Sequence, residues 1–156
     1  MTRIDFYILP SEGSTLSVAV KLCDKAANAG KKVFVACGDG AQLGALDDLL
    51  WTQRQGSFIA HERYEGRAPA LPLPQVLLGT EPPPGDWQDV LLNLAPTVPD
   101  YFSGFERLCE IVGSDEASRA ESRKRFKFYR ERGYELNTLE QTTAGEWNTR
   151  QSGGTA

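Results

Sequence analysis

The segment from Arg119 to Arg132 carries the most distinctive side chains of this sequence. It holds seven basic residues and only two acidic ones, Glu121 and Glu131. On a helix, five of its side chains would share one face within an arc of about 80–100°. Guanidinium groups pair bidentately with carboxylates, and an aromatic ring covers an apolar group. The stripe therefore predicts a site for an acidic ligand that carries an apolar group. Its five members are Arg119, Arg123, Phe126, Lys127 and Arg130.

Two other interpretations of this basic segment stay open. A run of charges is often only the solvated face of a helix. The same residues could also form a nucleic-acid patch. The formal net charge of −4 at pH 7 argues against a protein that coats nucleic acid through its overall charge, so any anion site must be local.

Trp51 and Phe58 form a second pair of candidate functional residues. They flank a polar run at residues 52–55. Large aromatic residues at the ends of elements usually belong to the core. Two of them around a polar loop could instead form an exposed anchor for a protein partner, because aromatic residues dominate interface hot spots.

The residue types and their spacing give little indication of a catalytic or metal site. His61 is the only histidine, and acid–base or triad chemistry would need a partner such as Cys37 or Asp39 brought close in space. A lone histidine at a strand end is more often a structural hydrogen-bonding residue. The scattered cysteines Cys23, Cys37 and Cys109 give no metal-ligand pair. We expect no catalytic residue, no metal and no cofactor.

A nucleotide site is the main alternative from the enzyme class. The turn at residues 37–41 holds Gly38 and Gly40, but Leu43 occupies the third glycine position of G-x-G-x-x-G. No G-x-x-x-x-G-K-[ST] motif occurs in the chain. The acidic side chains of Glu12 and Asp39 would oppose a phosphate at the turns where one could bind.

The elements that must position these residues alternate along the chain. Apolar runs predict strands at residues 4–9, 33–37, 58–61, 75–79 and 89–94. Helical spacing of apolar residues predicts helices at 15–29 and 39–51. A strand, a helix and a second strand in succession indicate a parallel βαβ unit.

Two further helices are predicted near the carboxyl end. The first would begin at Pro99 with an inner stripe of Phe102, Phe105, Cys109 and Val112. The second is the basic helix, capped by Ser114 and ending near residue 133. We therefore predict one α/β domain at residues 1–139 with a mainly parallel sheet flanked by helices. A disordered tail at 140–156 would follow, apart from the lone Trp147.

The composition favours a soluble cytoplasmic protein. The amino-terminal residues show no signal-peptide pattern, and no apolar run approaches the roughly 18 residues of a membrane helix. Three separated cysteines fit reduced thiols better than a disulfide framework.

Four parts of the chain together carry a family resemblance. They are residues 6–9 (Phe-Tyr-Ile-Leu), 32–36 (Lys-Val-Phe-Val-Ala), 46–51 (Leu-Asp-Asp-Leu-Leu-Trp) with 57–61 (Ser-Phe-Ile-Ala-His), and the basic, aromatic run 123–133. In order and spacing, over residues 2–140, they resemble the chi subunits of the bacterial DNA polymerase III clamp-loader assembly. Two positions depart from the family pattern. Ala60 stands where proline is frequent, and Phe126 stands where tyrosine is common.

The resemblance implies a Rossmann-like fold without a phosphate-binding loop, and a non-catalytic adaptor in DNA replication. It implies two protein partners: the psi subunit, and the acidic carboxyl-terminal tail of single-stranded DNA-binding protein. DNA would be contacted only indirectly, and no membrane would be involved. Carried over by position, Trp51 and Phe58 would face the psi subunit. The residues carried over to the tail site are Val112, Arg119, Arg123, Phe126 and Lys127.

Overall fold

A computed structural model describes residues 1–10, 14–52, 59–67, 69, 73–141 and 146–149, and all structural statements concern these residues. The elements in chain order are β1 (Arg3–Ile8), α1 (Thr15–Asn28), β2 (Val33–Ala36), α2 (Gly40–Thr52), β3 (His61–Arg63), β4 (Val76–Gly79), β5 (Val90–Asn93), the 3-10 turn η1 (Phe102–Gly104), β6 (Arg107–Val112), α3 (Glu116–Glu131), β7 (Leu136–Gln141) and β8 (Trp147–Thr149). In this part of the chain, no helix has both the length and the apolar character needed to cross a bilayer.

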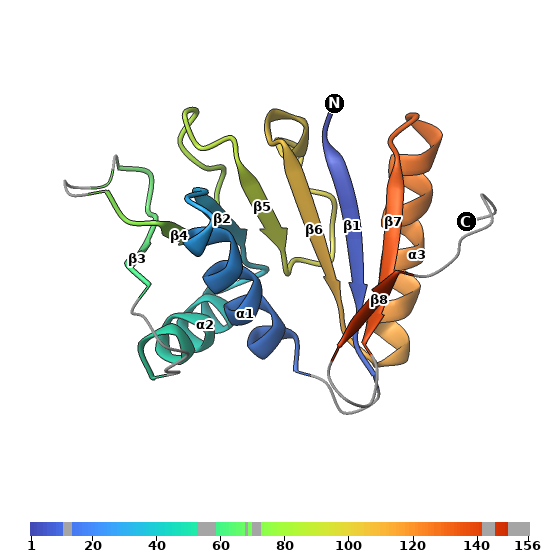
Figure 1. Cartoon of the computed structure of the whole chain (residues 1–156), viewed down its shortest axis with the longest axis horizontal. Helices are drawn as coiled ribbons and strands as arrows, with labels where there is room; N and C mark the ends of the chain where they lie inside the picture. Colours follow the sequence, from blue (N-terminus) through green and yellow to red (C-terminus); the bar gives the residue numbers. More distant parts are fainter. Residues whose placement is uncertain (11–13, 53–58, 68, 70–72, 142–145, 150–156) are drawn as a thin grey trace.

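The strands form one eight-stranded sheet in the order β3-β4-β2-β5-β6-β1-β7-β8. All neighbouring strands run parallel except β7 and β8. Helices α1 and α2 cover one face of the sheet and α3 covers the other (Figure 1). Strands buried on both faces need apolar residues at successive positions, which is why short continuous apolar runs identified β1, β2, β4 and β5. The predicted α/β fold, a mainly parallel sheet flanked by helices, is confirmed.

The helices on the first face begin and pack as their residue types predict. Ser14 caps α1, and its side chain accepts a hydrogen bond from the Ser17 backbone N–H. Asp39 accepts from the Gln42 N–H at 2.8 Å, at the start of α2. The buried residues of α2 are Leu43, Leu46 and Leu50, while Leu49 is partly buried.

The prediction of a helix from Pro99 to Val112 is wrong. The chain makes only the short turn η1 there and then the strand β6, which lies between β5 and β1 in the sheet. Cys109 and Ile111 face the α1 side, whereas Leu108 and Val112 face the α3 side. The spacing that looked helical arose because a central strand places apolar residues on both of its faces.

The sequence analysis predicted that the basic helix is the last element of the fold, and this is wrong. It connects β6 to β7, a strand that the sequence analysis missed, and β8 pairs antiparallel with β7. The Trp147 ring meets Tyr7 edge-on, with ring centroids 5.1 Å apart. Residues 140–141 at the end of β7 and 148–149 of β8 therefore lie in strands, where disorder was expected. Residues 142–145 and 150–156 lie outside the described residues.

Candidate functional site

A tight turn out of β6 sets the start of α3. An added Cβ on Gly113 would lie 3.0 Å from Asp115 Oδ1, so a larger residue there would press on the Asp115 side chain. Asp115, and not Ser114 as predicted, caps the helix, because its carboxylate accepts from the Ser118 N–H at 3.0 Å and from the Ser118 hydroxyl at 2.7 Å. These hydrogen bonds from Ser118 lower the pKa of Asp115.

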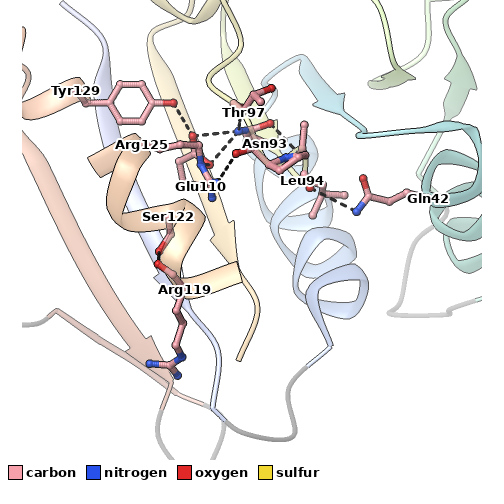
Figure 2. A network of polar contacts seen from close by, with 11 residues as sticks. Gln42, Asn93, Leu94, Thr97, Glu110, Arg119, Ser122, Arg125 and Tyr129 are labelled. Carbon is pink, nitrogen blue, oxygen red and sulfur yellow. Dashed lines mark hydrogen bonds and ion pairs between the residues drawn. The ribbon is translucent and has the colours of Figure 1, made fainter. Parts of the chain in front are cut away.

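The inner face of α3 is fixed to the sheet by a buried carboxylate, Glu110 of β6 (Figure 2). Arg125 Nε donates to Glu110 Oε1 at 3.0 Å, and the Tyr129 hydroxyl donates to Oε2 at 2.5 Å. The Asn93 amide of β5 donates to both oxygens, at 3.0 and 3.1 Å. This network decides which side of α3 is buried, and the sequence analysis missed it.

The protonation of the network follows from its surroundings. Burial raises the pKa of the Glu110 carboxyl, while the Arg125 charge and the hydrogen bonds from Tyr129 and Asn93 oppose that rise. Burial and the neighbouring Glu110 raise the pKa of Tyr129 well above its ordinary value, so the phenol keeps its proton and acts as a donor.

The outer face of α3 brings the predicted basic stripe together. Arg123 and Lys127 are exposed and lie one turn apart. Between them, Phe126 is half-buried against Phe6 of β1, with ring centroids 5.2 Å apart. The Arg130 guanidinium lies 6.0 Å from the centre of the Phe126 ring. A ring flanked by cations can hold an apolar group and pair with carboxylates beside it.

Arg119 belongs to the same stripe but is partly engaged with the backbone. Its guanidinium donates to the Ser114 carbonyl at 3.2 Å and to the Leu9 carbonyl at 3.3 Å. In Figure 2 the Arg119 side chain points away from the Glu110 network, toward the end of α3 that follows β6. These two contacts use only part of its five N–H donors, so the group can still bind an anion.

Val112 differs from the other predicted tail-site residues. It ends β6, is only 1% exposed and belongs to the core cluster against which Phe126 packs. Its side chain therefore supports the site from beneath and offers almost no surface to a ligand. Ile8, which lies beside Val112 in register and is half-buried on the same side, was not among the candidates from the sequence. The alternation of Ile4, Phe6 and Ile8 along β1 is the signal that could have found it.

The second candidate surface lies around the last turn of α2. Trp51 is 59% exposed, which is unusual for so large an apolar side chain. Phe58, its predicted companion, lies outside the described residues. His61, considered above as a possible catalytic residue, is instead packed against the Trp51 ring.

The nucleotide and metal alternatives weighed above gain no support from the described residues. Gly38 N–H donates to the Gln42 side chain at 2.7 Å, so this turn is occupied by the chain's own groups. Burial raises the pKa of the Cys37 thiol to about 12, which keeps it protonated and unreactive. Among the residues that are described, no three His, Cys, Asp or Glu side chains gather as a metal site would require.

Together these features define an α/β protein that displays a basic, aromatic helix face and an exposed tryptophan on different elements. The chain matches the family described as DNA polymerase III chi subunit, HolC, over residues 1–137. It therefore belongs to the DNA polymerase III chi subunit family, a family of DNA replication. The match ends within β7, so Glu140 and β8 lie beyond it.

Individual relatives agree with this assignment. The DNA polymerase III subunit chi of Pseudomonas aeruginosa is 41% identical over 138 residues, covering 87% of this chain and 94% of the relative. The subunit chi of Haemophilus influenzae is 32% identical, covering 85% of this chain and 93% of the relative. The subunit chi of Escherichia coli is 29% identical, covering 88% and 97%.

Proposed function

We propose that this chain is a non-catalytic adaptor of the DNA polymerase III clamp-loader complex. It binds the acidic carboxyl-terminal tail of single-stranded DNA-binding protein through α3, and the psi subunit through the surface around Trp51. The observation that carries the first half of this proposal is the pair of exposed cations, Arg123 and Lys127, beside the half-buried Phe126 ring.

The geometry of α3 supports specific roles for these side chains. Arg123 and Lys127 pair with carboxylates at the end of the tail, and Arg119 pairs with aspartates upstream. Phe126, with Ile8 beside Phe6 on β1, covers the apolar terminal residue of the tail. The buried Arg125–Glu110 pair holds the helix in the rotation that points this stripe outward.

Binding of this kind should be weak for one tail and sensitive to salt. A disordered peptide that orders on binding typically reaches an affinity in the micromolar range. Exposed ion pairs are screened as the ionic strength rises. An oligomeric partner with several tails would compensate through valency.

Replacing Arg123 by Glu tests the tail site directly. We expect Arg123→Glu to abolish binding of an acidic, Phe-terminated peptide in a fluorescence anisotropy titration, a loss of at least about 30-fold, because one attractive pair becomes a repulsive one. The thermal unfolding temperature should change little, because Arg123 is exposed.

Lys124→Glu provides the matched control, since it makes the same change in charge on the neighbouring position, which lies outside the stripe and about 100° around the helix from Arg123. Lys124 is exposed and pairs with Glu121 at 3.5 Å. Equal losses for both variants would mean that net charge alone attracts the peptide. Normal binding by Arg123→Glu would contradict the tail site.

Bare single-stranded DNA at moderate salt should not bind to this protein, because the proposed adaptor contacts DNA only through the protein that coats it.

The surface around Trp51 supports the second half of the proposal. An exposed tryptophan at the end of a helix is the side chain most enriched at interface hot spots. It lies near β3, one of the two edge strands of the sheet, whereas α3 packs against β6 and β7. This separation supports the proposal that both partners bind at the same time.

A further inference from the structure

The exposed Trp51 side chain is held by a buried neighbour. Its indole meets the His61 imidazole with ring centroids 4.7 Å apart and an interplanar angle of 62°. Trp51 is 59% exposed, whereas the side chain of His61 is fully buried. The indole thus packs at a tilt against a buried ring, while Trp51 as a whole remains largely open to solvent.

The imidazole lies between helix α2 and the segment that leads into β3. His61 Nδ1 lies 2.8 Å from the Ile59 carbonyl oxygen, and Nε2 lies 3.3 Å from Asp47 Oδ1 of α2. Arg63 Nε donates to the other carboxylate oxygen of Asp47 at 3.0 Å. These contacts tie β3 to α2, which lie next to each other at one end of the sheet (Figure 1).

An exposed indole without such support would sample several rotamers. A partner that receives the indole must then select one of them, and this ordering reduces affinity. A ring that already lies in one orientation avoids most of that cost. The series of contacts that runs from Arg63 through Asp47 and His61 to Trp51 therefore forms a preorganised anchor.

We propose that His61 is a positioning residue that holds Trp51 in the orientation in which a partner receives it. The partner that fits offers an apolar recess wide enough for an indole. This inference rests on the proposed function, in which that partner is the psi subunit, and it assigns the only histidine of the chain a role in recognition.

A double-mutant cycle with the psi subunit tests the proposal. Trp51→Ala should weaken binding at least about 30-fold, as expected for a hot-spot tryptophan. His61→Ala should weaken binding about fivefold, the effect of releasing one immobilised side chain. The double variant should bind no more weakly than Trp51→Ala alone, because His61 acts only through the indole. His61→Phe should restore most of the affinity, since its ring can still pack against Trp51.

The mobility of the indole gives a second readout that a merely structural role would not change. Relaxation of the ¹⁵N-labelled Trp51 indole should indicate a rigid ring in the unaltered protein and a mobile ring in His61→Ala. Trp87, which is 2% exposed, is the rigid reference in the same spectra. If His61→Ala fails to fold, His61→Gln takes its place, because it keeps a polar side chain without a ring.

The possible failures are distinguishable. Unchanged binding of Trp51→Ala would reject the proposed psi surface itself, and with it this inference. A loss with Trp51→Ala combined with full affinity in His61→Ala would reject only the positioning role. Losses that add in the double variant, or an indole that stays rigid in His61→Ala, would also reject it.

Discussion

Among the seven basic residues between positions 119 and 132, Arg125 has a role opposite to that of Arg123. Its side chain is 7% exposed and donates to Glu110 and to the Pro96 carbonyl, the latter at 2.8 Å. Arg123, two positions earlier, is exposed. One arginine thus anchors the helix and the other is available to a ligand. A buried pair of this kind is costly to break, because removing one partner leaves an uncompensated charge in the core.

Arg125→Met should therefore destabilise the fold by about 3–5 kcal/mol near neutral pH. The variant removes the charge that opposes desolvation, so the pKa of Glu110 rises further in the folded state. A carboxyl with a folded pKa above its ordinary value of 4.5 takes up a proton on folding. The stability of the variant should thus fall as pH rises through the folded pKa. Urea unfolding at about pH 5 and pH 8 measures the difference.

The control for this prediction is the double variant Glu110→Gln with Arg125→Met. It leaves no buried charge at this place, so it should recover part of the loss and show a weaker dependence on pH. If Arg125→Met were as stable as the unaltered protein at the higher pH, the Glu110 pair would not anchor α3.

At the scale of elements, α3 is a crossover helix with strands on both sides of it in the chain. It follows β6 and precedes β7, and both strands lie beside β1. The strand β8 then adds an antiparallel edge to the sheet. Trp147 packs with Tyr7 and Leu139 on the α1 side of the sheet, the face opposite to α3.

Trp147→Ala should lower stability without affecting the tail site. We expect a loss of about 1–2 kcal/mol in urea unfolding, because an edge-to-face ring pair and its buried area are removed. The affinity for the acidic peptide should not change, because Trp147 and Phe126 of the tail site lie on opposite faces of the sheet. Asn148→Ala is the control, since Asn148 is exposed on the same strand. A loss of peptide affinity in Trp147→Ala would mean that β8 contributes to the site.

At the scale of the whole molecule, the sheet separates the two candidate surfaces. The strand β3, beside α2 and Trp51, is five strand spacings from β1 in the sheet order. At ~4.8 Å per spacing, this places the two strands about 24 Å apart. The two candidate surfaces therefore lie toward opposite ends of one sheet, which is the arrangement that the proposed adaptor role requires.

The two surfaces should act independently. Arg123→Glu should lose binding of the acidic peptide and retain binding of the psi subunit, and Trp51→Ala should show the reverse. Changes in binding free energy at sites this far apart are normally additive. Calorimetric titration of the peptide into this protein alone and into its mixture with the psi subunit measures this, and the two affinities should agree within about twofold. If the peptide and the psi subunit excluded each other, the proposed adaptor role would be contradicted.

Local patterns in the sequence determined most elements and the stripe on α3. Continuous apolar runs are required of strands covered on both faces, and side chains three and four positions apart must share a helix face. Arg119, Arg123, Phe126 and Lys127 were found in this way. Such patterns depend only on neighbouring residues, so they can be recognised without the fold.

Only the tertiary structure decided what depends on residues far apart in the chain. The run at 107–112 is a strand because β1 and β5 lie on either side of it, and this same placement buries Val112. Arg125 is an anchor because Glu110 lies beneath it, and the Trp51 ring meets the His61 ring because α2 and β3 lie side by side. Burial and pairing of this kind are set by the folded sheet, and the local sequence at 119–132 gives no sign of which of its arginines is buried.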